Sequence, residues 1–287
     1  MFGWEINLPE LTKGVDTTVT KKERVLSRLI MGVILVYLIL PIIATVLYSF
    51  STSWVKTILP EGFTLKWYGQ LISNTDFLSA LIRSIFLGIL TTIIAMACFL
   101  PIVFYANVYD TKIKVKLRFI TILPFTIPGI ILVTGLIQLY SNVPISKLLI
   151  LILAISLLTL PLTYQTLDNA FIARDFRGMF EQALILGDKP LNAFIKVIVP
   201  NIKSGILISM LLTFTSAFGE YVITNLLLGG DFETLKIYMY RLMQSNGQAS
   251  SVLTTIYFVF LALISLVMIN IVYHESTKNR QSRKESN

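Results

Sequence analysis

The sequence predicts an all-α membrane protein that crosses the bilayer six times and has both termini in the cytoplasm. The chain of 287 residues is 55% hydrophobic and only 14% charged, whereas soluble domains have about 25% charged residues. It contains six uncharged or nearly uncharged runs, each long enough as a helix to cross a hydrocarbon core of about 30 Å. Its cationic residues are also distributed unevenly between the segments that connect these runs.

The apolar runs define a transmembrane domain over residues 29–273. The predicted spans cover residues 29–50, 84–109, 119–141, 148–167, 204–228 and 251–273. Long continuous runs favour helices, because the strands of a membrane barrel alternate apolar and polar side chains. Residues 1–28 form a predicted cytoplasmic N-terminal segment and residues 274–287 a cytoplasmic tail. The first run is too long for a removable signal peptide, so we expect it to remain as a helix.

The positive charge follows the predicted topology. Of the 24 Lys and Arg residues, 18 lie in the two terminal segments and in the connections between spans two and three and between spans four and five. The positive-inside rule places these segments in the cytoplasm. The net charge of +8 therefore reports topology and predicts no nucleic-acid partner. With one Cys and one His, the chain has no residues for a disulfide scaffold or a Cys/His metal centre.

Residues 169–203 form the longest predicted cytoplasmic connection. Apolar residues recur at helical spacing over 180–187, a Gly-Asp-Lys-Pro turn follows, and a second amphipathic stretch over 191–199 ends at Pro200. A helix, turn and helix tethered at both ends to membrane spans can dock into a groove of a soluble partner. The alternative is a loop that packs only on its own bundle.

The same loop carries a recognisable motif. It reads Glu181-Gln182-Ala183, three residues, Gly187, nine residues, Val197, one residue, Val199-Pro200. This resembles the EAA motif of type I permease subunits of binding-protein-dependent ABC importers, whose usual form is EAA, three residues, G, nine residues, I, one residue, LP. The spacing agrees throughout, with conservative departures at Gln182, Val197 and Val199.

The resemblance implies a type I ABC importer (MetI-like) fold in which the loop forms a coupling helix seated on an ATP-binding subunit. The implied ATPase-coupling residues are Glu181, Gln182, Ala183, Gly187, Asp188, Lys189 and Pro200. The chain contains no G-x-x-x-x-G-K-[ST] phosphate loop. We therefore expect no enzymatic activity and no cofactor in this chain, with ATP and Mg bound by the partner ATPase.

The family resemblance also implies partners and a location. The partners are two ATPase subunits, a second permease subunit that is identical or related, and an extracytoplasmic substrate-binding protein, all acting at membrane lipid. The location is the plasma (inner) membrane of a bacterium, with a multi-pass topology. A stand-alone secondary transporter is the least favoured alternative. A membrane-embedded enzyme is disfavoured because no cluster of acidic, Arg or His side chains lies near a span end.

Glu220 is the one acidic residue within a predicted span. A charge at the bilayer centre costs about 3 kcal/mol on insertion scales, so Glu220 should face the bundle or a wet cavity. Helical spacing places Ser216 and Thr213 on its face, with Tyr221 beside it and Asn225 one turn on. These five residues are candidates for the substrate pathway, with Glu220 attracting a cationic substrate. The alternative is that Glu220 is a structural partner within the bundle or for a second permease.

Two further segments bear on the substrate. The FTLKWY segment over 63–68 resembles the first external loop of permeases in the polyamine, iron(III) and phosphonate branch. The FGEYVITNLLLGG segment over 218–230 resembles the second permease of the spermidine/putrescine type. A polyamine such as spermidine or putrescine is therefore the best prediction. The alternatives are that the same kind of importer carries iron(III), 2-aminoethylphosphonate, thiamine or another small solute.

Overall fold

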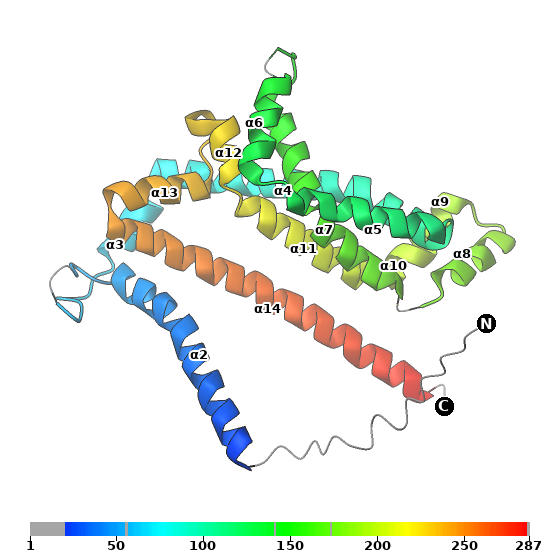
Figure 1. The fold of residues 1–287 in the computed structure, drawn as a ribbon, viewed down its shortest axis with the longest axis horizontal. Coiled ribbons are helices and arrows are strands. Elements are labelled where there is room, and N and C mark those ends of the chain that lie inside the picture. Colours follow the sequence, from blue (N-terminus) through cyan, green and yellow to red (C-terminus); the bar gives the residue numbers. More distant parts are fainter. Residues whose placement is uncertain (1–20, 55–56, 141, 173, 286–287) are drawn as a thin grey trace, which may run out of the picture.

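The computed structural model describes residues 21–54, 57–140, 142–172 and 174–285, which are almost entirely helical (Figure 1). The α-helices are α2 (Lys21–Ser49), α3 (Lys66–Ile72), α4 (Thr75–Val108), α5 (Thr111–Thr126), α6 (Gly129–Tyr140), α7 (Lys147–Ile172), α8 (Phe176–Ile185), α9 (Pro190–Ala193), α10 (Val199–Asn201), α11 (Lys203–Phe218), α12 (Val222–Leu227), α13 (Leu235–Ser245) and α14 (Gly247–Glu285). The predicted all-α fold class is confirmed. Residues 1–20 of the predicted N-terminal segment lie outside the described residues.

Helix α7 lies at the centre of the molecule and contacts α4, α5 and α11. These four helices run side by side in Figure 1. Small residues allow close approach: a Cβ added at Gly205 of α11 would lie 2.4 Å from the Cβ of Ala170 in α7. Helix α4 has 34 residues and is therefore roughly 51 Å long. It is longer than the apolar layer of a bilayer, so its ends extend beyond that layer.

Four helices are long and apolar enough to cross a membrane by themselves. They are Lys22–Ser49, Thr75–Val108, Lys147–Ile172 and Gly247–Tyr273, and they correspond to predicted spans one, two, four and six. Two further pairs of helical segments are each bent at a short break: α5 with α6, and Pro190–Asn201 with α11. If each bent pair is one span, the number of spans is six. Helix α2 contacts α14, and its apolar side chains from Val25 to Ile43 are largely exposed. Such a surface is suited to hydrocarbon, in which the helix backbone is satisfied internally.

The segment of the third predicted span, over 119–141, is not one continuous helix. Helices α5 and α6 meet at an angle of 92°. The break falls at Ile127, whose backbone is extended (φ −96°, ψ 116°), immediately before Pro128. A residue that precedes proline is biased away from the helical conformation by contact with the proline ring. The other prolines of the apolar runs lie inside helices, at Pro41, Pro101, Pro124 and Pro161.

The fifth predicted span is also not one helix. Helix α11 ends at Phe218 and α12 begins at Val222. At the first residue of the break, a Cβ on Gly219 would lie 2.6 Å from the hydroxyl oxygen of Tyr257 in α14. Only glycine permits that approach without a shift of the tyrosine. The segment over 204–228 therefore changes direction at residues 219–221.

The two ends of the bundle have different components. The end of α4, the start of α5 and helices α8 to α10 gather at one end, whereas α3, α13 and the start of α14 lie at the other (Figure 1). The first end carries both basic connections of the sequence, over 111–118 and 174–203. By the positive-inside rule it is the cytoplasmic end, called the inner end below. The opposite end is called the outer end.

Candidate functional site

Helix α8 forms at the inner end because its termini and one face are satisfied locally. The carboxylate Oδ1 of Asp175 accepts a hydrogen bond from the backbone N–H of Gly178 at 3.0 Å, which caps the first turn. Phe176, Phe180 and Ala183 recur at helical spacing and are buried. The helix is thus amphipathic, with one face against the bundle and the other in solvent.

Aromatic contacts hold the buried face of α8 against the end of α4. The ring of Phe180 lies 5.2 Å from that of Phe104 and 5.6 Å from that of Tyr109, both edge-on. Phe176 packs edge-on against Phe171 at the end of α7, at 5.3 Å. Edge-to-face pairs at these distances are favourable beyond the area that they bury. Helix α8 is therefore joined to both α4 and α7, and its displacement would be transmitted to them.

A Schellman turn ends α8 at Gly187. The N–H of Asp188 donates to the carbonyl of Ala183 at 3.1 Å, and the N–H of Gly187 donates to the carbonyl of Leu184 at 3.0 Å. Gly187 has a φ of +93°, and no atom lies within 4 Å of the position that a Cβ would take. Of the two explanations for a small residue here, close helix approach and a tight turn, the structure supports the turn.

The solvent face of α8 combines charge with exposed apolar side chains. Glu181 accepts a hydrogen bond from Nε of Arg177 at 2.9 Å, and Gln182 is exposed beside it. At the end of the helix Ile185 is 84% exposed and Leu186 is 87% exposed. Large apolar side chains in this arrangement outside the long apolar spans indicate a contact surface.

The chain returns to the bundle through α9, a π-helical turn at Phe194–Ile198, and α10. The exposed Lys189 precedes α9, and the carboxylate of Asp188 lies 4.0 Å from Nζ of Lys196. Pro200 is exposed in α10. Nη1 of Arg174 donates to Oδ1 of Asn201 at 2.7 Å and joins the two ends of the loop. All seven predicted coupling residues therefore belong to one helix–turn–helix unit at the inner end.

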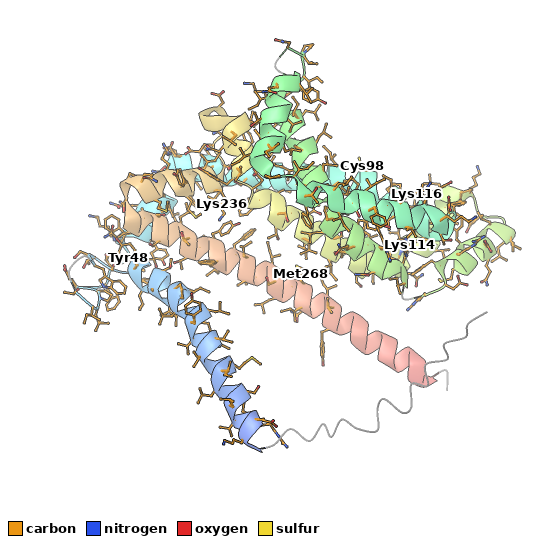
Figure 2. All side chains as sticks on the ribbon, in the orientation of Figure 1. Tyr48, Cys98, Lys114, Lys116, Lys236 and Met268 are labelled. Carbon is orange, nitrogen blue, oxygen red and sulfur yellow. The ribbon has the colours of Figure 1, made fainter. Side chains whose placement is uncertain are left out.

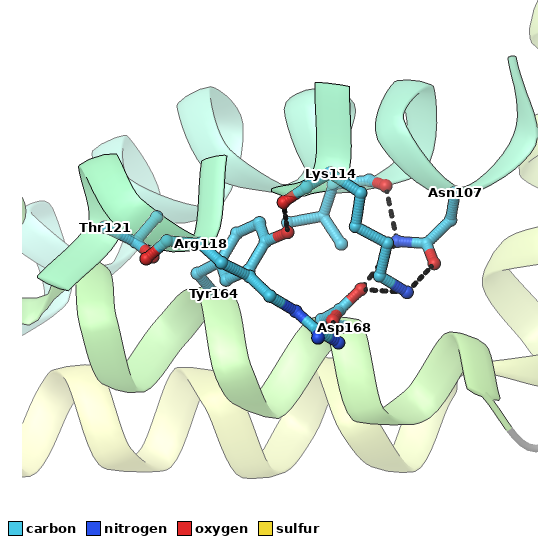
Figure 3. Close-up of polar contacts among 7 residues, drawn as sticks. Asn107, Lys114, Arg118, Thr121, Tyr164 and Asp168 are labelled. Atoms are coloured by element: carbon cyan, nitrogen blue, oxygen red, sulfur yellow. Dashed lines mark hydrogen bonds and ion pairs between the residues drawn. The ribbon is translucent and has the colours of Figure 1, made fainter. Parts of the chain in front are cut away.

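A buried ionic network beside this unit was missed by the sequence analysis. Asp168, near the end of α7, has a side chain only 4% exposed. Its oxygens lie 2.8 Å from Nζ of Lys114 and 3.2 Å from Nη2 of Arg118, and Nδ2 of Asn107 donates to it at 3.0 Å. Figure 3 shows these side chains of α4 and α5 converging on Asp168.

The network joins α4, α5 and α7 just before the chain enters the loop over 169–203. The sequence analysis assigned no role to Asp168 and counted Lys114 and Arg118 only among the charges that report topology. One signal was available, because a spacing of four residues puts both cations on one helical face. Their convergence on one carboxylate required the tertiary structure.

The candidate pathway residues are not arranged as their helical spacing predicted. Because α11 ends at Phe218, Glu220 does not continue the face of Ser216 and Thr213. Its Oε1 accepts from the N–H of Ile223 at 2.7 Å, and its Oε2 accepts from the N–H of Thr224 at 2.8 Å and from the hydroxyl of the same threonine. Glu220 thus caps the first turn of α12.

The remaining pathway candidates lie in different surroundings. Thr213 is buried, and its hydroxyl lies 2.9 Å from that of Thr163 in α7. Ser216 is partly buried on α11. Asn225 donates to the hydroxyl of Tyr221 at 3.4 Å. The ring of Tyr221 lies 5.4 Å from that of Tyr240 in α13.

The comparison with known families agrees with this geometry. The family described as "Binding-protein-dependent transport system inner membrane component" matches residues 103–275. The chain belongs to this family. The matched region includes the helix–turn–helix unit at the inner end, the Asp168 network and both broken spans. The chain is therefore a multi-pass component of an inner membrane transport system, and the sequence-based recognition of a type I ABC importer permease is confirmed.

Two relatives cover most of the chain. It is 26% identical over 259 residues to the spermidine/putrescine transport system permease protein PotC of Escherichia coli strain K12, which covers 86% of this chain and 94% of the relative. It is 23% identical over 236 residues to a protein of Salmonella typhimurium named "Putative 2-aminoethylphosphonate transport system permease protein PhnV", with 81% and 88% covered. Both names describe transport permeases.

A solved structure shows the same fold. A chain of a bacterial ABC transporter involved in the import of the acidic polysaccharide alginate aligns with a TM-score of 0.62 at 15% identity, covering 88% of this chain and 98% of that chain. At this identity the likeness concerns the fold and carries no information on the substrate.

Proposed function

We propose that this chain is one permease subunit of an ATP-driven importer. It pairs with a second permease, identical or related, and the pair works with two ATPase subunits and an extracytoplasmic binding protein. The chain performs no chemistry on the solute. ATP and Mg are bound by the ATPase subunits, and this chain contributes the passage through the membrane.

The main support is the two-sided character of α8. Its buried face is fixed to α4 and α7 by Phe176 and Phe180, whereas Ile185 and Leu186 are exposed to solvent at the inner end. A partner that moves the exposed side must also move the helices attached to the buried side. This is the arrangement that transmits a rigid-body displacement from a soluble motor to a membrane bundle.

Two substrate classes follow from the relatives' names, a polyamine and 2-aminoethylphosphonate. The sequence analysis favoured a polyamine because Glu220 could attract a cation. In the structure both carboxylate oxygens of Glu220 are engaged in capping α12, so this residue no longer distinguishes the classes. Both kinds of solute carry ammonium groups, and only 2-aminoethylphosphonate also carries an anionic phosphonate.

The coupling role is tested by the variant Leu186→Glu. Leu186 is solvent-exposed, so the variant should fold normally. A carboxylate placed in an apolar contact should cost about 2 kcal/mol or more, which is a roughly 30-fold loss of affinity. The measurement is the amount of ATPase subunit that co-purifies with the chain in detergent.

The matched control is Ile58→Glu at the outer end. Ile58 is 94% exposed and its substitution introduces the same charge, but it lies outside the proposed contact. We expect normal co-purification for this variant. Equal retention of the ATPase by both variants would show that α8 is not the contact and would overturn the coupling role.

A further inference from the structure

A cavity of about 300 Å³ lies at the outer end, where α11 and α12 separate. Its lining comes from three segments: the break at Gly219 and Tyr221, helix α13 with Lys236, Met239 and Tyr240, and the start of α14. Figure 2 shows Lys236 between α13 and α14. The cavity has the volume of a site for a small solute.

The charge of Lys236 is not balanced by a carboxylate. Its Nζ lies 4.2 Å from the centroid of the Tyr257 ring, a favourable cation–π position. Among the described residues, no carboxylate oxygen lies within 4.0 Å of this ammonium. Burial lowers the pKa of Lys236, as expected for an ammonium that loses water without gaining an anion.

The nearby acidic residues are engaged elsewhere. Arg241 forms ion pairs with the carboxylates of Glu233, at 2.9 Å, and of Asp76, at 3.4 Å. Glu220, which lies between the lining residues Gly219 and Tyr221, uses both oxygens to cap α12. None of the lining residues is acidic, and Lys236 is the one cationic residue among them. Lys236 also lies in the first turn of α13, where the helix dipole adds positive potential.

We propose that this cavity binds an anionic group of the imported solute, a phosphonate, phosphate or carboxylate, with Lys236 as its charge partner. An oxyanion would supply the charge-assisted hydrogen bonds that the ammonium lacks. The ring of Tyr257 holds the ammonium from one side and leaves its other side to the solute. A purely cationic polyamine would meet a like charge here. The proposal rests on the proposed importer function and selects between its substrate classes.

The test measures protection of Lys236 in the complete transporter, purified with its partner subunits in lipid nanodiscs. An uncharged amine-reactive ester labels accessible lysines, and peptide mass spectrometry gives the labelling rate of each. The probes are methylphosphonate, inorganic phosphate and acetate, at ionic strength matched with sodium chloride. Hexamethonium, a dication without reactive amines, replaces a polyamine. Lys66, whose Nζ lies 5.7 Å from the centroid of the Trp67 ring outside the cavity, is the internal control.

We expect at least one anion to slow the labelling of Lys236, by about tenfold when it is present at ten times its dissociation constant. The labelling rate of Lys66 should stay unchanged, and hexamethonium should protect neither lysine. Absence of protection by all three anions, equal protection of Lys66, or protection by hexamethonium would overturn the proposal. Co-purification of the ATPase in the same preparation reports separately on the importer function. A failure of the anion-site proposal can therefore be distinguished from a failure of the importer function.

Discussion

The inner and outer ends of the molecule each hold a network of carboxylates and cations, and the two networks differ in burial. At the inner end the side chain of Asp168 is 4% exposed and binds Lys114 and Arg118. At the outer end the side chain of Asp76 is 60% exposed and shares Arg241 with Glu233. An exposed ion pair contributes little to the free energy of unfolding. Removing one partner of a buried ion pair costs several kcal/mol, because the other charge stays buried and unpaired. The inner network therefore fixes helix positions, and the outer one leaves α13 less constrained.

The two glutamates singled out from the sequence show the same contrast. Glu181 lies on an exposed face and pairs with Arg177, so its carboxylate can exchange partners. Glu220 lies in an apolar segment, and its oxygens are used by the backbone of α12. The role of a carboxylate thus depends on what its oxygens already bind, which the hydropathy of the surrounding sequence does not report.

The largest expected effect comes from Asp168→Asn. Loss of the charge leaves Lys114 without an anionic partner in a largely buried position, although its ammonium still donates to Oδ1 of Asn107. The free energy of unfolding should fall by about 3 kcal/mol, the low end for a broken buried pair, because Arg118 is partly exposed. The measurement is the midpoint of thermal unfolding in detergent. The matched variant Asp76→Asn should cost less than about 1 kcal/mol. Similar shifts for both variants would remove the distinction between the two networks.

An intermediate effect is expected for Gly187→Ala. A left-handed backbone costs a residue with a Cβ about 1–2 kcal/mol, and the open space around Gly187 makes this strain the main cost. The turn after α8 should shift and ATP-driven transport in proteoliposomes should fall. Gly69→Ala is the control, because Gly69 lies in α3 with equally open surroundings and no positive φ. Equal activity of the two variants would contradict the role of the turn.

The smallest of the three effects is expected for Glu220→Gln. The amide keeps one acceptor oxygen and loses the second, so α12 should be destabilised by about 1 kcal/mol. If Glu220 is structural, transport should fall only in proportion to the folded fraction, measured by size-exclusion chromatography. A loss of transport with an unchanged unfolding midpoint would restore the pathway role. Glu61→Gln, the same change at an exposed residue of the outer loop, controls for the loss of charge itself.

The sequence by itself determined the fold class, and it predicted the helix–turn–helix in the loop over 169–203. These features are local: the length of an apolar run reports a membrane helix, and the spacing from Glu181 to Pro200 lies within one loop. The turn at Gly187 was predictable because its hydrogen bonds join residues three to five positions apart in the chain.

Only the tertiary structure decided the two broken spans, the Asp168 network and the cavity at Lys236. Five prolines lie in the apolar runs; the chain breaks before Pro128, whereas the other four lie inside helices. Asp168 meets residues about 50 to 60 positions away, and the cavity at Lys236 is lined by the break at residues 219–221 and by α13 and α14. Such contacts depend on how helices pack against one another, and residue spacing within one helix does not contain that information.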